Sequence, residues 1–373
     1  MERLDKIFQL GLKELRSLWH DKVLVLFILW AFTGGIYAAA TGTSLELNNA
    51  PIAIVDLDQS ILSNRLKEAF QPPYFKTPEE ISLEEVDALL DAGVYTFVLV
   101  FPSGLENDIR AGRRPEIQVN IDATRMSQAF IGSNYIQNIL VREINTLVHR
   151  SEMVMDLPVN QVVHLKFNPN GESAWFGSVM EIINNITMLS IILTGAALIR
   201  EREHGTIEHL LVMPLTPFEI MAAKVWASAL VVLAAASFSL WAVVHTALQV
   251  PIAGSVSLFL LGALLHLFST CSMGIFLGTI ARSMPQLGLL LILTLLPLQM
   301  LSGGITPRES MPEIVQNIML IAPTTHFVAF AQAILYRGAG IAVVWPQFLA
   351  VTVIGIAFFA GAHLRLRKSL ASL

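Results

Sequence analysis

The stretch Val256–Ile280 reads VSLFLLGALLHLFSTCSMGIFLGTI and contains no Asp, Glu, Lys or Arg. A helix needs about 20 predominantly apolar residues to cross the hydrocarbon core of a bilayer, so this stretch predicts a membrane-spanning helix. Similar apolar runs predict further spans at about 23–40, 175–199, 224–246, 287–301 and 343–363. The run at 287–301 is the shortest of these and contains Pro297.

The composition of the whole chain agrees with a membrane protein. Of its 373 residues, 54% are hydrophobic and 14% are charged, whereas soluble domains carry roughly a quarter charged residues. The formal net charge is −5, and the charged side chains gather between about 46 and 172 and beside the apolar runs. The single cysteine, Cys271, lies inside an apolar run, which excludes an intramolecular disulfide and a cysteine-rich metal site.

Lys and Arg near the ends of the spans predict the orientation, because cytoplasmic loops carry an excess of these residues. They gather in the N-terminal segment, in the link at 200–224, at Arg282 and in the tail at 365–368, whereas the link around Pro251 carries none. We therefore expect a multi-pass protein of the bacterial inner membrane, with both termini cytoplasmic and residues of about 41–174 periplasmic. Ala38-Ala39-Ala40 resembles a signal-peptidase site, but the long apolar run before it favours an uncleaved anchor.

Residues 1–22 predict an amphipathic helix on the cytoplasmic surface of the membrane. One helical side is apolar and most cations fall elsewhere, where anionic headgroups attract them. A plain cytoplasmic extension of the first span, 23–40, is the alternative, and Trp19 favours the interfacial interpretation. The apolar side consists of Leu4, Ile7, Phe8, Gly11, Leu15, Leu18 and Trp19.

The block at 41–174 predicts a small α/β domain. Strands are expected at 51–57, 95–101 and 116–121, and helical patterns alternate with them. Ser82 and Glu85 have the spacing of a capping box. The block has no Gly-rich phosphate loop, nucleophile elbow or His pair at metal spacing. Asp56 and Asp58 suit turn capping better than a calcium loop, so we expect a docking or gating module.

The predicted fold is thus an all-α membrane bundle of six transmembrane helices, with an extracytoplasmic α/β domain inserted between helices 1 and 2. In this scheme residues 175–373 hold helices 2–6, a cytoplasmic coupling helix within 200–224 and an outer re-entrant segment at 302–338.

The link at 200–224 begins with the run RERE HGTIEHLLVMP LTPFE at 200–219. Gly205 can end the preceding helix in a left-handed conformation, Thr206 can cap a short amphipathic helix, and Pro214 ends that helix. Thr216 and Glu219 form a second capping box with Pro at the first helical position. Such a helix is a handle that a soluble partner could grip, although a well-capped loop without a partner fits these residues equally well.

Residues 200–214 of this run, followed by Pro217, Glu219 and Lys224, resemble the signature of ABC-2 type permeases. A second match is LSGGITPRESMP at 301–312, with Pro-Thr-Thr-His at 323–326 and Gly338, and it resembles the family's outer re-entrant segment. The outer block resembles the branch of multidrug and xenobiotic exporters, through 54–56, Ser63, Gly93 and Pro102. Residues 177–181 depart from this branch, because a Pro-Gly pair is common there.

The resemblance implies a permease subunit of an ATP-driven exporter, which moves a hydrophobic or amphipathic compound out of the cytoplasm or the inner leaflet. It also implies a separate ABC ATPase subunit docked on the link and a second permease copy or paralogue. A periplasmic adaptor is a further candidate partner. The chain holds no phosphate loop of its own, so we expect ATP with Mg to be bound by the partner ATPase. We also expect no enzyme activity, cofactor, metal or nucleic acid at this chain. The implied coupling residues are Arg200, Glu201, Glu203, Gly205, Thr206, Glu208, Pro214, Glu219 and Lys224.

Polar residues at membrane depth are costly and are candidates for function. Glu181 and Asn185 share a helical face, and Gln299 lies beside Pro297, so we expect these three residues to line a transport pathway or its gate. We expect the same role for Ser302, Gly303, Pro307, Met311 and Pro312. Hydration of Glu181 near the outer interface is the alternative for that residue. In the fourth span, packing explains the polar and small residues better than substrate contact does; these are His266, Ser269, Thr270, Gly274 and Gly278.

Two other classes of function remain open from the residues alone. An ion-coupled secondary transporter needs buried acids or broken helices at the midplane, and the spans offer one off-centre Glu. A membrane sensor with a ligand-binding outer domain needs fewer spans than this chain has.

Overall fold

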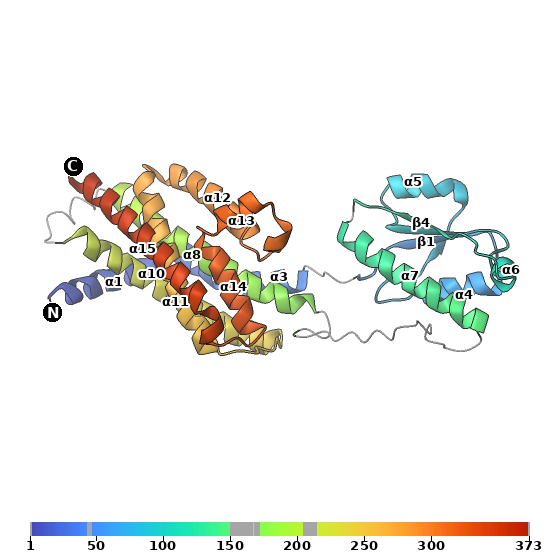
Figure 1. Ribbon diagram of the computed structural model, residues 1–373. Coiled ribbons are helices and arrows are strands. Elements are labelled where there is room, and N and C mark those ends of the chain that lie inside the picture. Colours follow the sequence, from blue (N-terminus) through green and yellow to red (C-terminus); the bar gives the residue numbers. More distant parts are fainter. Residues whose placement is uncertain are drawn as a thin grey trace. The chain divides into compact units, whose positions relative to one another are not determined.

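The computed structural model describes residues 2–42, 47–124, 126–149, 167, 172–203 and 215–371 (Figure 1). The chain divides into two compact units, one formed by Met1–Gly42 with Ala174–Leu373 and the other by Thr43–Ser173. The helices of the first unit are α1 (Glu2–His20), α2 (Lys22–Phe32), α3 (Gly34–Gly42), α8 (Ser173–Glu203), α10 (Pro217–Ser239), the π-helix η2 (Leu240–Ala247), α11 (Val256–Ile280), α12 (Met284–Met300), the 3-10 turn η3 (Arg308–Ser310), α13 (Glu313–Met319), α14 (Pro323–Leu335) and α15 (Ile341–Ala371).

Among the described residues, five stretches of this unit are long and apolar enough to cross a membrane. They correspond to five of the six predicted spans, and they are Lys22–Gly42, Ala174–Glu203, Pro217–Ala247, Val256–Ile280 and Ile341–Lys368. A sixth is reached only if the pair α13 and α14, which is bent by 90°, counts as one span.

The predicted span at 287–301 is α12, which does not meet this length. Its 17 residues extend about 25 Å at 1.5 Å per residue, short of the roughly 30 Å of a hydrocarbon core. Pro at the first turn fixes its start. Past its end, Gly303 has a φ of 95°, which continues no right-handed helix.

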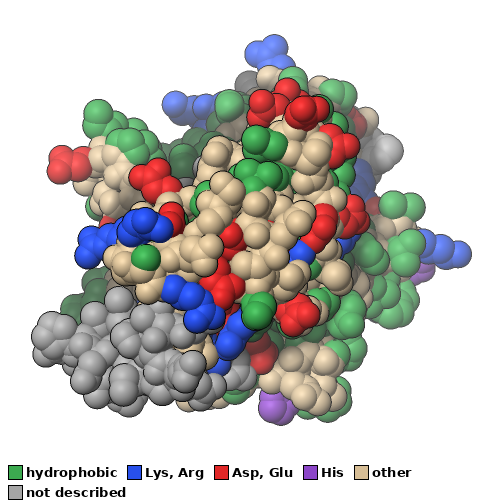
Figure 2. Space-filling view, turned by 90° about the vertical axis from the view of Figure 1, so that its right-hand side faces the viewer, with side chains coloured by type: hydrophobic (Ala, Val, Ile, Leu, Met, Phe, Trp, Pro, Cys, Tyr) green, Lys and Arg blue, Asp and Glu red, His purple; other side chains and the backbone are tan. Residues whose placement is uncertain are grey.

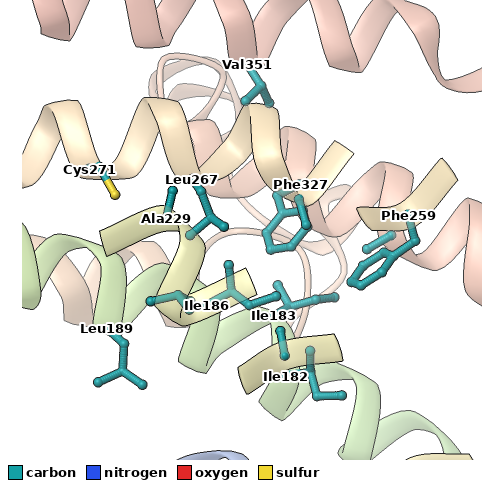
Figure 3. Packing of buried hydrophobic residues seen from close by; sticks show 14 of the residues in the cluster. Ile182, Ile183, Ile186, Leu189, Ala229, Phe259, Leu267, Cys271, Phe327 and Val351 are labelled. Carbon is teal, nitrogen blue, oxygen red and sulfur yellow. The ribbon is translucent and has the colours of Figure 1, made fainter. Parts of the chain in front are cut away.

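The core of the first unit lies where α8, α10, α11, α14 and α15 meet. Figure 3 shows Ile183 and Ile186 of α8 close to Leu267 and Phe327, which come from α11 and α14. Small residues let α8 and α11 approach closely: a Cβ on Gly274 would lie 2.4 Å from the carbonyl oxygen of Ile191. The predicted packing role of Gly274 is therefore confirmed, and its neighbour across the contact is α8.

The second unit contains a four-stranded sheet in the order β2-β1-β3-β4. Strands β1 (Ile52–Asp56), β2 (Glu79–Glu80) and β3 (Phe97–Phe101) are parallel, and β4 (Gln118–Ile121) pairs antiparallel with β3. The remaining elements are α4 (Ile61–Ala69), the 3-10 turn η1 (Leu83–Glu85), α5 (Val86–Asp91), α6 (Leu105–Arg110) and α7 (Met126–His149).

Side chains alternate across the two central strands of this sheet. Ile52, Ile54 and Leu99 pack with residues of α4 and α7 on one face, and Val55 and Val98 pack with Val86 of α5 on the other. Both faces of β1 and β3 are therefore covered, as parallel strands require. Exposed charged residues such as Glu84, Arg113 and Arg114 remain at the surface, and Figure 2 shows acidic and basic side chains spread over the face in view.

Candidate coupling and pathway sites

A buried ion-pair cluster joins α1, α8 and α10. Lys224 of α10 is 2% exposed, and its Nζ lies 3.0 Å from Oε1 of Glu14 and 2.9 Å from Oε2 of Glu201. Lys13 of α1 lies 3.3 Å from the other oxygen of Glu201. We call these four residues the Lys224 network. It connects the N-terminal helix α1 to α8 and α10, the two helices on either side of residues 204–214.

The start of α10 fixes where Lys224 lies. The hydroxyl of Thr216 accepts a hydrogen bond from the N–H of Glu219 at 3.3 Å, and the Glu219 carboxylate accepts one from the N–H of Thr216 at 2.7 Å. The predicted capping box is therefore confirmed, with Pro217 at the first turn. Because the box sets the first turn of α10, it also sets the direction in which Lys224 points two turns later.

Helix α1 lies against α10 through more than charge. The indole Nε1 of Trp226 donates to the carbonyl oxygen of Ile7 at 3.2 Å, and Phe8 stacks on the same indole with 5.8 Å between ring centres. A Cβ on Gly11 would lie 2.1 Å from the indole ring, so only glycine allows this approach. Part of the apolar side of α1 is thus buried on α10, whereas Leu4 remains exposed.

Polar side chains in the last turn of α8 contact the ends of three other helices. Arg200 pairs with Asp21, the N-cap of α2, at 3.2 Å. Arg202 donates to the carbonyl oxygen of Ala281 at 2.7 Å, which satisfies an acceptor at the C-terminus of α11. Glu203 accepts from the N–H of Met284 at 2.8 Å, at the start of α12. A displacement of this turn would therefore reach α2, α11 and α12.

The coupling residues predicted from sequence divide into two groups. Arg200, Glu201, Glu203, Glu219 and Lys224 occupy the positions just described. The other group lies outside the described residues, so the short helix in the link stays a prediction; it comprises Gly205, Thr206, Glu208 and Pro214. Beside the Lys224 network is a cavity of about 210 Å³, lined by Lys13, Glu14, Ser17, Leu18, Ala197, Arg200 and Glu201.

The candidate pathway residues are less closely grouped. Ser302, Gly303 and Pro307 line a second cavity of about 450 Å³, together with Phe176, Gly304, Ile305, Arg308, Glu309, Thr325, Val328, Ala329, Gln332 and Arg337. Gln299 is half-buried on α12, Met311 is buried, and Pro312 is the exposed N-cap of α13; these three do not line the cavity.

Asn185 has a packing role in this structure. It is 3% exposed, and its Nδ2 donates to the carbonyl oxygen of Ala31 at 2.7 Å, which joins α8 to α2. Glu181 is half-buried, and its carboxylate lies beside the amides of Asn184 and Asn185. Neither residue lines the cavity of about 450 Å³.

Polar residues of α11 form bonds to α8, as their positions in the sequence suggested. Thr187 Oγ1 and His266 Nε2 lie 2.9 Å apart, and the hydroxyl of Ser190 donates to that of Thr270 at 2.6 Å. The hydroxyl of Ser269 has no hydrogen-bond partner among the described residues. The first two pairs are interhelical contacts of the packed core.

Two carboxylates, one at the end of β1 and one just beyond it, accept hydrogen bonds mainly from the backbone. Asp56 accepts hydrogen bonds from the N–H groups of Asp58 and Gln59 and from the hydroxyl of Ser63. Asp58 accepts one from the N–H of Glu106. This agrees with turn capping, and the described residues hold no group of three or more His, Cys, Asp or Glu that suits a metal ion.

Comparison with known proteins assigns the family. The sequence pattern of the family described as "ABC-2 family transporter protein" matches residues 23–364. The chain belongs to the ABC-2 transporter family.

Relatives of this ABC-2 permease agree along nearly their whole lengths. It is 60% identical to the inner membrane transport permease YhhJ of Escherichia coli, over all of both chains. It is 28% identical to the probable multidrug ABC transporter permease YbhR of Escherichia coli, over 97% of this chain and 98% of the relative. With its apolar helices, the permease is a multi-pass inner-membrane protein and a transport subunit, not an enzyme.

Sequence reasoning missed two residues of the Lys224 network of this ABC-2 permease, Lys13 and Glu14. A signal was present for Glu14, because it falls on the same side of α1 as Ile7, Gly11 and Leu18. A carboxylate within an apolar helical side indicates a cationic partner on the surface that covers it. Nothing in the local sequence could identify Lys224 as that partner.

Proposed function

We propose that this chain is the membrane-spanning subunit of an ATP-driven exporter and that a separate ATPase subunit docks on the link at 200–224. The Lys224 network is the observation that carries the proposal. In this network Lys224, which is 2% exposed, binds Glu14 of α1 and Glu201 of α8, so that both ends of the link are joined to α1. A soluble partner that displaced the link would then move several helices together.

Buried charges suit this mechanical role for a physical reason. Separating Lys224 from Glu14 or Glu201 would leave a charge without a partner in a poorly solvated place, which is strongly unfavourable. The ends of α8 and α10 therefore move with α1, and the contacts of Arg202 and Glu203 carry the displacement to α11 and α12. In this proposal force from the link tilts the bundle as a connected body.

The remaining parts of the proposal concern placement and partners. Both termini are cytoplasmic and residues of about 41–174 are periplasmic; ATP and Mg are bound by the ATPase. A second permease copy or paralogue completes the pathway, and a periplasmic adaptor is a further partner. The apolar side chains exposed on α12 need lipid or such a copy to cover them, and they include Leu289, Ile292, Leu293 and Leu296.

The substrate is a hydrophobic or amphipathic compound that leaves the cytoplasm or the inner leaflet. Two relatives carry names of probable multidrug permeases, and the pathway offers few ionisable groups for ion coupling. These two facts favour ATP-driven export over a secondary transporter.

The test is a gentle-detergent pull-down of the full chain from its native membrane, followed by identification of bound proteins and an ATPase assay. We expect the wild type to bring down a nucleotide-binding subunit and Glu208→Lys in the link to lose it or to uncouple it. Glu313→Lys, on the exposed first turn of α13, makes the same charge change away from the link and should behave as the wild type. Absence of any ATPase in crosslinked wild-type membranes would overturn the proposal and favour a secondary transporter or a sensor.

A further inference from the structure

The cavity of about 450 Å³ has one wall formed by a single side of α14. Thr325, Val328, Ala329 and Gln332 follow one another at spacings of three, one and three residues, so they share a helical face. Residues 302–305 and 307–309 also line it, and Phe176 at the start of α8 and Arg337 beyond α14 complete the lining. The size falls within the range of roughly 300–1,000 Å³ that is usual for small-molecule sites.

Three polar groups around this cavity lack a partner among the described residues. They are the hydroxyls of Ser302 and Thr325 and the Nε of Arg308. Ser302 and Thr325 are each 1% exposed, so bulk water does not compensate them. Buried polar groups are almost always hydrogen-bonded. A cluster of unpaired ones around a single cavity is therefore the pattern expected where a ligand supplies the missing partners.

The polarity of the lining favours an anion. Arg308 and Arg337 contribute two guanidinium groups and Glu309 one carboxylate, and no ion pair joins the two arginines to other described residues. One contact from Arg308 is long, at 3.5 Å from Nη2 to the carbonyl oxygen of Gln316. Thr325 also lies in the first turn of α14, whose N-cap Ala322 provides no side-chain acceptor. Free N–H groups at a helix N-terminus attract negative charge.

The same cavity is apolar in its other parts. Phe176, Ile305, Val328 and Ala329 line it, and the side chains of Phe176 and Ile305 are 38% and 61% exposed. A small hydrated anion would leave this surface without a partner. An amphiphile with a charged head and a hydrocarbon tail would satisfy both parts of the lining.

We propose that this cavity binds the oxyanion head of an amphiphile, a phosphate or a carboxylate, through Arg308, Arg337 and the hydroxyls of Ser302 and Thr325. The tail lies along Phe176 and the apolar residues of α14. A membrane lipid and an amphiphile in transit share this chemistry. The site does not depend on the proposed docking of an ATPase, so it can be tested on the permease alone.

The test uses the full-length chain in dodecyl maltoside micelles, which carry no phosphate or carboxylate, with dodecyl phosphate as the probe and dodecanol as its uncharged match. Binding is followed by the shift in thermal unfolding temperature and by titration. We expect dodecyl phosphate to raise the unfolding temperature and dodecanol to leave it unchanged. Inorganic phosphate should bind more weakly than dodecyl phosphate, because it lacks the tail.

Variants separate the site from general effects of the probe. Arg337→Gln combined with Thr325→Val should weaken dodecyl phosphate binding at least tenfold, whereas Arg282→Gln, an exposed arginine on the α11–α12 link, should not weaken it. Thr325→Val alone keeps the side-chain shape and removes an unpaired hydroxyl, so it should fold as well as the wild type and bind less. Ser302→Ala gives a second, independent test of the hydroxyls if the double variant fails to fold.

Transfer of the chain into nanodiscs distinguishes a membrane lipid from an amphiphile in transit as the natural occupant. If phosphatidylglycerol is the natural occupant, nanodiscs that contain it should stabilise the chain and compete with dodecyl phosphate. If an amphiphile in transit is the occupant, phosphatidylglycerol should do neither while dodecyl phosphate still binds. Equal binding of dodecyl phosphate and dodecanol, or unchanged binding by Thr325→Val and Ser302→Ala, would overturn the proposal.

Discussion

Lys224 is a long, charged side chain held out of water by two carboxylates from distant parts of the sequence. Its partners Glu14 and Glu201 come from α1 and α8, while Lys13 remains largely solvated, with 54% of its side chain exposed. Two cations of one network thus differ in their surroundings. The difference matters because a charge that cannot reach water depends entirely on its partners.

Lys224→Met should therefore destabilise the permease strongly. Removing one partner of a buried ion pair costs about 3–5 kcal/mol, since the remaining charge stays buried. Lys13→Met is the matched control, and an exposed pair of this kind contributes only about 0–1 kcal/mol. Thermal unfolding of the purified full chain compares the two variants. Equal unfolding temperatures would show that Lys224 is better hydrated than its 2% exposure indicates.

Adding Glu14→Gln to Lys224→Met tests the same network from the acidic side. This change removes the charge that Lys224→Met leaves stranded, so the double variant should recover part of the lost stability. The double-mutant comparison is informative because residues in contact are not additive. A double variant less stable than Lys224→Met alone would contradict the pairing.

Asp56 predicts a pH dependence in the second unit. Burial by itself raises the pKa of its carboxyl. Hydrogen bonds from Gln59, Ser63 and Asp58, together with the nearby ammonium of Lys67, outweigh burial and hold that pKa below its ordinary value. A lowered folded-state pKa contributes stability that is complete above the unfolded value of about 3.9. The contribution is then lost as pH falls through the folded-state pKa.

Hydrogen exchange of the full chain, corrected for the intrinsic pH effect, should therefore show the turn from β1 to α4 opening as the pH falls below about 4. Asp56→Asn should lower its protection already at neutral pH, because the amide loses the charge paired with Lys67. Protection in that variant that equals the wild type at neutral pH would show that the charge of Asp56 stabilises nothing.

At the scale of elements, the contact of α8 with α11 depends on the absence of side chains. A Cβ on Gly274 would lie 2.2 Å from Thr194 Oγ1 and 2.4 Å from the carbonyl oxygen of Ile191. The second of these is backbone, so α8 would have to move away. The interhelical bonds of His266 and Thr270 would then be stretched as well.

Gly274→Ala should accordingly destabilise the bundle, by about 1–3 kcal/mol as for other overpacked cores. Gly288→Ala on α12 is the matched control, because nothing lies within 4 Å of its added Cβ. That variant should be neutral or gain up to about 1 kcal/mol from helix propensity. The comparison is made by thermal unfolding of both variants, and an opposite ranking would show that α8 and α11 are loosely packed.

Elements formed by residues close together in the sequence were predictable, whereas elements formed by distant pairings were not. The capping box of Thr216 and Glu219 joins residues three positions apart, and it was predictable. The strand Glu79–Glu80 was not, because two residues carry no periodicity and the strand exists only by pairing with β1. The apolar run that follows Lys224 predicted its place at the membrane edge, but its partner Glu14 lies 210 positions away.

Prediction of the candidate pathway residues was limited in the same way. Ser302, Gly303 and Pro307 were chosen from a motif and do line a cavity. Thr325 and Gln332 of α14 and Arg337 beyond it were not chosen, because no local pattern indicates that they line one cavity with Ser302. Asn185 was chosen for its polarity at membrane depth, and its amide binds a carbonyl group of the first span.

At the scale of the whole molecule, the single cysteine makes the orientation testable. Cys271 is 0% exposed, so the wild-type chain should not react with a membrane-impermeant maleimide on either side. Glu84→Cys and Lys368→Cys replace exposed residues on the two parts of the chain that we expect on opposite sides of the membrane. Each variant therefore carries one reactive thiol, and no background thiol needs to be removed.

In intact spheroplasts, the maleimide should label Glu84→Cys at once and Lys368→Cys only after permeabilisation. The physical reason is the excess of Lys and Arg in the N-terminal segment, the link and the tail, which favours a cytoplasmic location for them. Labelling of Lys368→Cys before permeabilisation would place the tail outside. In that case an ATPase could not reach the link from the cytoplasm, and the Lys224 network would have to be explained as a purely structural cluster at the outer surface.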